Sequence, residues 1–317
     1  MLKQQKFNQR FNKQQGLTLI ELMVALVIFS IITISVFALY INANRAYNED
    51  EKFARMQENG RFALNIIAGD LNMADFWGEM LGPEFINQAA VTFGADCNIA
   101  LDEPEKALRY YEDGGSSSYD PTGCGLKAGT NALAIKRVAN TPTADADVVD
   151  GRVYLRTNGF EGSWIDDADS NPATAGYQDW LYLPSIYFIK EDADGVPYLC
   201  RAMINIGTTA LSTIGNADDD CMAEGVEELY VEFGIDTDND GVANQYVSDV
   251  DDDLIATAVT ARVYLLVRSK DEVLAYENDK YYNLGNLAQL GPYNDSYYRR
   301  VYNTTVTLRN PLNAQKF

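Results

Sequence analysis

The stretch Gly16-Leu17-Thr18-Leu19-Ile20-Glu21, followed at once by LMVALVIFSIITISVFALYI from Leu22 to Ile41, decides how this chain folds. The second part contains twenty residues without a charge, which is about the length that crosses the hydrocarbon core of a bilayer. The first sixteen residues of the chain include no acid and four bases, Lys3, Lys6, Arg10 and Lys13. Basic residues stay on the cytoplasmic side of a membrane helix. The sequence therefore predicts one transmembrane helix with a cytoplasmic N-terminus and the remaining chain outside.

Helical character continues beyond the apolar run. A secretory signal would be shorter and would end in a small-residue cleavage site, which is not seen here. No proline occurs from Asn44 to Ala74, and apolar residues recur there mostly at steps of three and four: Phe53, Met56, Phe62, Leu64, Ile67 and Leu71. We expect one helix from about Leu17 to about Met73, about 85 Å long at ~1.5 Å per residue, with an apolar first half and an amphipathic second half.

The chain after Trp77 changes to short apolar or alternating runs separated by Gly, Asn, Asp and Pro. These runs predict an antiparallel sheet laid against the exposed half of the helix, an α+β fold. We expect long loops at Asp96 to Gly129 and Asp166 to Gln178. The expected strands are Ala132–Val138, Arg152–Thr157, Trp180–Lys190, Tyr198–Ile204, Leu229–Ile235, Val259–Arg268 and Val301–Leu308.

Composition excludes several functions. The chain has 25 basic and 46 acidic side chains, a formal net charge of -21, which argues against binding nucleic acid or anionic lipid. It contains no histidine, so triads built on histidine and histidine zinc sites are excluded. We find no phosphate-binding loop, nucleophile elbow or metal triad, and read the acidic runs 218–220 and 251–253 as solvated turns. The sequence predicts no enzyme and no required cofactor.

Four cysteines suggest two disulfides. None of them has the Cys-x-x-Cys spacing of a zinc or redox site, and disulfides form in oxidising compartments. Three pairings are open. Cys97 with Cys124 and Cys200 with Cys221 are favoured, because each pair closes a modest loop.

An acidic turn is a candidate calcium site. Asp236-Thr237-Asp238-Asn239-Asp240-Gly241 matches the first half of a calcium-binding loop, in which alternate carboxylates converge. The twelfth position, where a bidentate Glu is expected, is Val247. Closure would have to come from Asn244, Asp249, Asp251 or water, and the alternative is a plain hairpin turn. We take Asp236, Asp238, Asp240 and Asn244 as the candidate ligands.

Glu21 is a candidate functional residue, since a carboxylate within a membrane helix is expensive unless it has a role. The plain alternative is that its side chain reaches back to the headgroup layer. Glu21 lies four residues after Leu17, about one helical turn deeper. A new amine at Leu17 would attract such a carboxylate strongly in a low dielectric.

The basic leader ending in Gly16, followed by Leu-Thr-Leu-Ile-Glu, resembles the class III signal of type IV prepilins. The resemblance implies that a prepilin peptidase cleaves between Gly16 and Leu17 and methylates the amine of Leu17. The usual residue after the cleavage point is Phe, so Leu17 is a mild departure. In that family the residue at the position of Glu21 is thought to neutralise the N-terminus of a neighbouring subunit during assembly.

Later segments are similar to PilW-like minor pilins. They are residues 57–64 (QENGRFAL), Asp70-Leu71, Phe76-Trp77-Gly78 and residues 299–310 (RRVYNTTVTLRN). The resemblance implies a pilin-like fold and a subunit that primes assembly and remains at the tip of the pilus. It implies these partners: other minor pilins, the major pilin, the prepilin peptidase, the inner-membrane assembly platform and a PilY-type adhesin. It also implies residence in the inner membrane before assembly and on the pilus afterwards.

We expect four segments: a leader at 1–16, a transmembrane half-helix at 17–41, an amphipathic half-helix at 42–76 and a β-rich domain at 77–317.

Two rival interpretations of the function remain open. One is a pseudopilin of a type II secretion system, which shares the leader and the long helix. The other is a signal-anchored periplasmic protein, which predicts that Gly16 is not cleaved and that Glu21 is dispensable.

Overall fold

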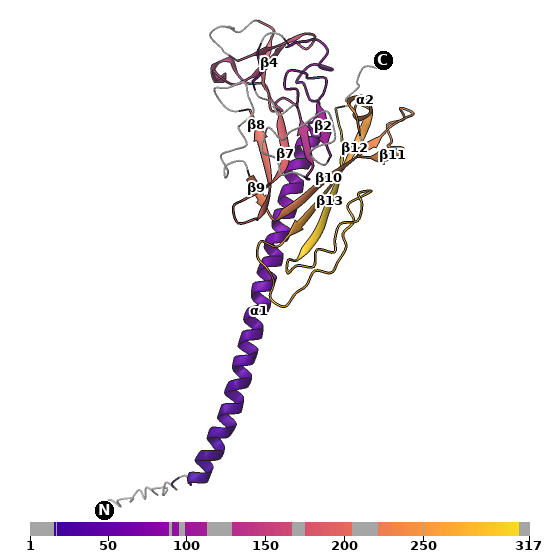
Figure 1. Cartoon of the computed structure of the whole chain (residues 1–317). Helices are drawn as coiled ribbons and strands as arrows, with labels where there is room; N and C mark the ends of the chain where they lie inside the picture. The colour runs from indigo at the N-terminus through magenta and orange to yellow at the C-terminus, as the bar shows by residue number, and fades with distance from the viewer. Residues whose placement is uncertain are drawn as a thin grey trace, which may run out of the picture. The chain divides into compact units, whose positions relative to one another are not determined.

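The protein is described by a computed structural model over residues 16, 18–88, 91–94, 99–112, 129–166, 175–204, 221–248 and 250–310. Its contacts divide it into two compact units, residues 1–51 and 52–317, and each is described by itself. One helix, α1, extends from Leu19 to Asn72 and contributes to both units (Figure 1). The sequence prediction of a helix over about 17–73 is confirmed to within two residues at either end.

The described residues of the second unit form three sheets. The first, here the helix-side sheet, has the strand order β11-β10-β12-β13, and the central sheet has the order β2-β3-β7-β8-β9. The outer sheet has the order β1-β5-β4-β6 and includes one parallel pair, β1 with β5. The helix-side strands are β10 (Val226–Ile235), β11 (Gln245–Val247), β12 (Ala258–Arg268) and β13 (Arg299–Thr307). The central strands are β2 (Leu108–Tyr111), β3 (Ala132–Ile135), β7 (Ser185–Glu191), β8 (Pro197–Met203) and β9 (Cys221–Glu224). The outer strands are β1 (Ile86–Asn87), β4 (Tyr154–Thr157), β5 (Gly162–Ile165) and β6 (Gln178–Leu181).

Among the described residues, two short helical segments lie between the strands. The 3-10 helix η3 covers Asp145–Asp147, and α2 covers Asp252–Ile255. The carboxylate of Asp251 caps α2 by accepting the N–H of Leu254 at 2.7 Å.

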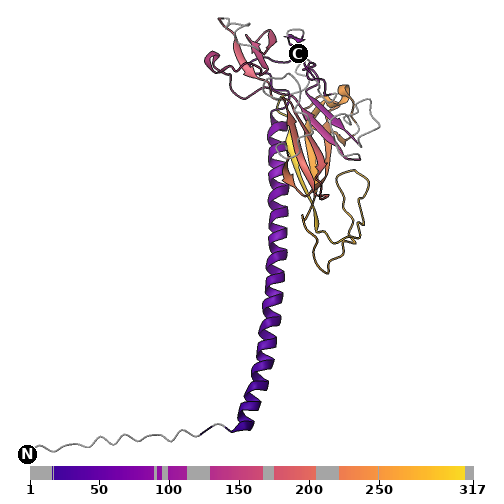
Figure 2. The ribbon, with the colours of Figure 1, turned by 60° about the vertical axis from the view of Figure 1, so that its left-hand side comes forward.

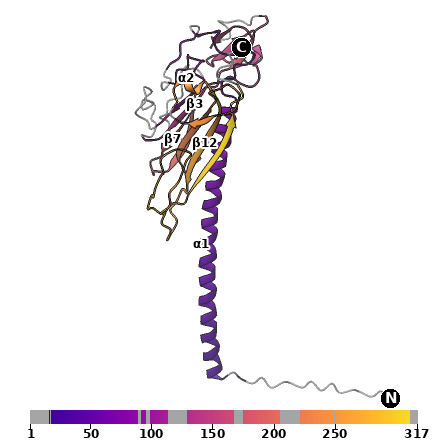
Figure 3. The same ribbon diagram turned by 90° about the vertical axis from the view of Figure 1, so that its right-hand side faces the viewer.

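The period-2 alternation of the strands distributes side chains between separate cores. In β7, Tyr187 and Ile189 pack with α1, whereas Ile186 and Phe188 pack toward the outer sheet. The core next to α1 uses one face of the helix: Met56, Ala63, Leu64, Ile67 and Leu71. Figures 2 and 3 show this part of α1 running alongside β13, drawn in yellow.

A glycine carries the chain from the central sheet into the helix-side sheet. Gly225 lies between β9 and β10 at φ +85°, donates its N–H to Pro197 O at 2.7 Å and accepts the N–H of Arg268 at 2.7 Å. A Cβ at this position would lie 2.3 Å from Arg268 O. Only glycine fits both the positive φ and this close approach.

The connection from Ser269 to Tyr298 covers the face of the helix-side sheet that points away from α1. Its Tyr282 and Leu284 pack against Tyr230 and Leu266 of that face. Because both faces of this sheet are covered, its central strand β10 is buried continuously from Leu229 to Ile235 rather than at alternate residues.

The α+β class is confirmed, but the details of the sheet prediction need correction. The strand expected over Trp180–Lys190 is two strands, β6 and β7, in different sheets, because Pro184 interrupts the ladder between them. The loop expected over Asp96–Gly129 contains β2. One predicted sheet is in fact three, because the turn-rich region after Trp77 contributes the short strands of the outer sheet. The sequence pattern did not show β1 and β11, which are only two and three residues long, and it also missed the four-residue strands β2, β5 and β9.

Candidate assembly and metal-binding sites

The first residues of α1 form a capping box. The Glu21 Oε2 atom accepts the N–H of Thr18 at 2.9 Å and the hydroxyl of Thr18 at 2.9 Å, while Thr18 Oγ1 accepts the N–H of Glu21 at 3.4 Å. In this motif two backbone donors at the start of a helix are satisfied reciprocally. Sequence reasoning missed it, although the Thr-x-x-Glu spacing directly before an apolar run is its usual signal.

The cleavage point predicted from sequence lies just before this box. Gly16 is exposed, and a built Cβ there would meet nothing within 4 Å, so its backbone is open to another molecule. Leu17, the residue expected to become the methylated N-terminus, lies outside the described residues.

The helix that follows is apolar enough to cross a membrane. An 18-residue window of α1 reaches a mean hydropathy of 2.8, and no residue of that window is buried by the protein. A soluble fold would leave this surface in contact with water at a large free-energy cost, so lipid or neighbouring helices are its natural environment.

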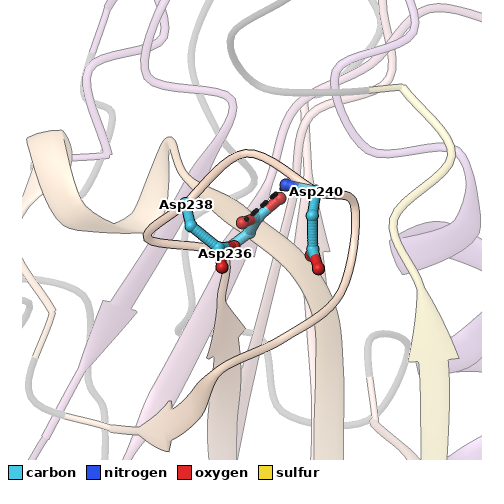
Figure 4. Close-up of side chains that lie close together, drawn as sticks. All are labelled: Asp236, Asp238 and Asp240. Atoms are coloured by element: carbon cyan, nitrogen blue, oxygen red, sulfur yellow. Dashed lines mark hydrogen bonds between the residues drawn. The ribbon is translucent and has the colours of Figure 1, made fainter.

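The acidic turn after β10 brings three of the four candidate calcium ligands together. One carboxylate oxygen from each of Asp236, Asp238 and Asp240 lies within 4.8 Å of the others (Figure 4). Asp238 and Asp240 are exposed, whereas Asp236 is buried. Convergent carboxylate oxygens are the ligands that Ca²⁺ prefers.

Backbone N–H groups hold the Asp236 side chain in place. Its Oδ1 accepts the N–H of Asn239 at 2.7 Å and that of Asp240 at 3.3 Å, and its Oδ2 accepts the N–H of Gly241 at 2.8 Å. Desolvation acts to raise the pKa of Asp236, but the hydrogen bonds from Gly241 and Asn239 outweigh it and lower the pKa. The carboxylate is therefore ionised and oriented, as a cation ligand must be.

The fourth candidate, Asn244, is engaged differently. Its Oδ1 accepts the N–H of Thr237 at 2.6 Å and the hydroxyl of Thr237 at 2.9 Å, so it closes the turn on itself. Val247, at the twelfth position, pairs with Phe233 in the ladder between β11 and β10. Asp251 caps α2, and Asp249 lies outside the described residues.

One disulfide of the favoured pairing is present. Cys200 of β8 and Cys221 of β9 are cross-strand partners and are bonded, which confirms this pair. Cys97 and Cys124 lie outside the described residues.

A buried acid near the end of α1, which the sequence analysis did not single out as an ion-pair partner, fixes the helix to the central sheet. Asp70 is 6% exposed; its Oδ1 accepts from Arg137 Nη2 at 2.7 Å and its Oδ2 from the hydroxyl of Tyr187 at 2.5 Å. Arg201 Nη1 lies 3.7 Å from Oδ2. The sequence signal was a charged residue interrupting the apolar stripe of the helix next to Leu71.

Two regions of the chain match known family models. Residues 186–310 match the family described as type IV pilus-assembly protein W, and residues 11–37 match the prokaryotic N-terminal methylation motif. The first region runs from β7 through β13, and the second contains the expected cleavage point and Glu21. No curated protein and no solved structure matches the chain. The two matches agree with the resemblance found in the sequence.

Proposed function

We propose that this chain, a PilW-like pilin with a prepilin-type methylation signal, is a minor pilin that primes assembly of a type IV pilus and remains in a complex at its tip. The observation that carries the proposal is the position of Glu21, one turn behind the expected cleavage point at the start of a membrane-length helix. Pilin families are structural, and we propose no catalysis for this chain.

The proposed mechanism begins with cleavage after Gly16, which places a new methylated amine on Leu17. Before cleavage the helix is held in the inner membrane with its N-terminus in the cytoplasm. Both hydrogen bonds from Thr18 end on Glu21 Oε2, which leaves Oε1 as an acceptor for the amine of a neighbouring subunit. In a low dielectric this attraction is strong and directional, so it can set the stagger between subunits.

Two variants separate the charge of Glu21 from its capping role. Glu21→Gln keeps a capping acceptor but removes the charge, whereas Thr18→Ala removes the capping hydroxyl and keeps the charge. We expect Glu21→Gln to insert in the membrane normally and to enter pili at least roughly tenfold less, since a loss of only about 1.4 kcal/mol is tenfold. We expect Thr18→Ala to be incorporated almost normally. The measurement is the ratio of this subunit in sheared pili to that in membranes.

The opposite pattern, with Glu21→Gln normal and Thr18→Ala defective, would mean that Glu21 serves only to start the helix.

Mass spectrometry of the mature protein tests the processing of the N-terminus independently. We expect N-methylated Leu17 at the N-terminus. An intact leader in a cell with an active prepilin peptidase would favour the signal-anchored periplasmic protein instead.

The proposed role as a minor pilin at the pilus tip needs a separate test. A strain lacking this chain should carry far fewer surface pili, and immunogold labelling of a complemented strain should find the chain at pilus tips rather than along shafts. Normal piliation combined with loss of protein secretion would identify a pseudopilin. The expected partners are other minor pilins, the major pilin, the assembly platform and a PilY-type adhesin, and co-purification with sheared pili tests each of them.

We also propose that the turn at residues 236–241 binds calcium and stabilises the adjoining β10–β11 hairpin. The support is the convergence of three carboxylates. Saturation at about 100 times Kd would stabilise the fold by about 2.7 kcal/mol, so chelation should lower Tm by about 5 °C. Asp238→Asn should abolish this difference, whereas Asp194→Asn, an equal change of charge in an exposed turn, should keep it. If chelator does not change the Tm of the unaltered chain, the turn is a plain hairpin turn and the calcium proposal is wrong.

A further inference from the structure

The outer sheet has an exposed edge where two segments far apart in sequence touch. Phe85 O accepts the N–H of Gly162 at 3.0 Å, at the point where β1 joins β5 in parallel. At the other end, a Cβ built on Gly159 would lie 3.7 Å from Glu79 O. Residues 79–86 therefore run beside the turn between β4, labelled in Figure 1, and β5.

Three large apolar side chains are exposed on these two segments. Leu81 is 92% exposed, Phe85 71% and Phe160 85%. Phe85 directly precedes β1, whose first residue, Ile86, is 6% exposed and packs inward. Leu81, Phe85 and Phe160 are called the edge patch below. Large exposed apolar side chains on adjoining segments are typical of sites of protein interaction.

The backbone of the turn that carries Phe160 is fixed by hydrogen bonds. Asn158 Oδ1 accepts the N–H groups of Phe160 and Glu161, each at 3.0 Å. The hydroxyl of Thr157 donates to Glu161 O at 2.8 Å and accepts the N–H of Gly159 at 3.0 Å. Because the backbone of this turn is ordered before any partner arrives, less backbone entropy is lost on binding.

The charges around the edge patch select the kind of partner. Glu79, Glu84 and Glu161 are exposed on the same two segments, and neither residues 79–88 nor residues 158–163 contain Lys or Arg. A second copy of this chain would bring like charges together, and an anionic lipid surface would be repelled in the same way. A surface of opposite charge would be attracted.

We propose that the edge patch is a docking surface for a different protein, one that presents apolar side chains bordered by Lys or Arg. The two phenylalanines would enter the partner's apolar surface, and the three glutamates would pair with its basic rim. Aromatic anchors within a charged rim are the usual arrangement of an interface whose core is dry. The proposal does not rest on a position at the pilus tip.

Photo-crosslinking in cells that make the full chain tests the proposal. Benzoylphenylalanine at position 160 keeps an aromatic group in the patch, and the same residue at position 274 is the matched control, because Leu274 is 78% exposed in a different loop. We expect a crosslink from position 160 to one other protein, with a Lys- or Arg-containing peptide at the crosslinked site. We expect none of this product from position 274.

Charge reversal provides the second measurement. Glu79→Lys together with Glu84→Lys should reduce the crosslink from position 160 at least fivefold, while the yield of folded protein stays constant because both side chains are exposed. The proposal is overturned by a crosslink only to a second copy or to lipid, by no product, by equal products from positions 160 and 274, or by an unchanged yield after charge reversal. The number of pili on the same cells is a separate measurement, which tests the proposed function and not the edge patch.

Discussion

At the scale of single residues, two ionisable side chains with shifted pKa values lie close together: Asp75, just after α1, and the buried Lys136, just after β3. Asp75 donates its N–H to Lys136 O, and its Oδ1 accepts from Trp77 Nε1 at 2.6 Å. Burial raises the pKa of Asp75 to about 8, against the hydrogen bond from Trp77, which lowers it. Burial lowers the pKa of Lys136 to about 7, although its ammonium can donate to Ala100 O at 2.6 Å and Glu103 O at 2.7 Å.

The raised pKa of Asp75 makes stability depend on pH. Between about pH 4 and pH 8 the folded state keeps a proton on Asp75 that the unfolded state releases, so the free energy of unfolding falls as pH rises. From pH 5 to pH 7 this contribution to the free energy of unfolding falls by about 2.7 kcal/mol, at about 1.4 kcal/mol per pH unit. The titration of Lys136 has its effect above about pH 7, where stability rises with pH, and does not disturb this window.

Asp75→Asn isolates this effect. Asparagine keeps the acceptor for Trp77, tolerates the positive φ of 61° and does not titrate. We expect the variant to gain stability relative to the unaltered chain as pH rises from 5 to 7, measured by urea unfolding in detergent micelles. Parallel pH curves for the two proteins would contradict the assignment of the buried proton to Asp75.

At the scale of elements, a glycine in the middle of α1 lets the helix approach β13. A Cβ at Gly60 would lie 2.7 Å from Tyr302 Cδ2, whereas a Cβ at Gly69 would meet nothing within 4 Å. Glycine lowers helix stability by about 1 kcal/mol relative to alanine, so its presence at position 60 is explained by packing and not by the helix itself.

These two glycines form a matched pair for mutation. Gly69→Ala should stabilise the protein by about 1 kcal/mol because it improves helix propensity without a clash. Gly60→Ala should gain the same propensity but displace the Tyr302 ring, for a net loss of about 1 kcal/mol. Thermal unfolding of both variants in one detergent measures the difference. An equal gain from both would show that β13 yields easily to the added methyl group.

At the scale of the whole molecule, the ion pair of Asp70 joins the second half of α1 to the central sheet. Arg137 follows β3, and Tyr187 and Arg201 lie on β7 and β8, so one helical carboxylate holds three parts of that sheet.

Asp70→Ala should destabilise the second unit by about 3 kcal/mol, because it leaves the partly buried guanidinium of Arg137 without its counter-charge. Glu58→Ala, an equal change of charge at an exposed position of the same helix, should change stability by less than about 0.5 kcal/mol. Chemical unfolding followed by tryptophan fluorescence measures both. If Asp70→Ala changes stability only slightly, the apolar core alone stabilises the contact between α1 and the central sheet.

The amino-acid sequence was sufficient to predict α1, its membrane-length apolar half, the α+β class and the resemblance to PilW-like prepilins. It was sufficient because these features are local: a charge-free run, a three- and four-residue period and a short motif next to Glu21 can each be read without knowing what they touch. The pairing of Cys200 with Cys221 was also predictable, since few alternatives existed.

The tertiary structure alone decided the division into three sheets, the ion pair of Asp70 and the edge patch. Each depends on contacts between residues far apart in the chain, such as Asp70 with Arg137 or Phe85 with Gly162, and a periodic pattern carries no information on such partners. Strands as short as β1 become strands only when a neighbour supplies their hydrogen bonds, so local propensity cannot identify them.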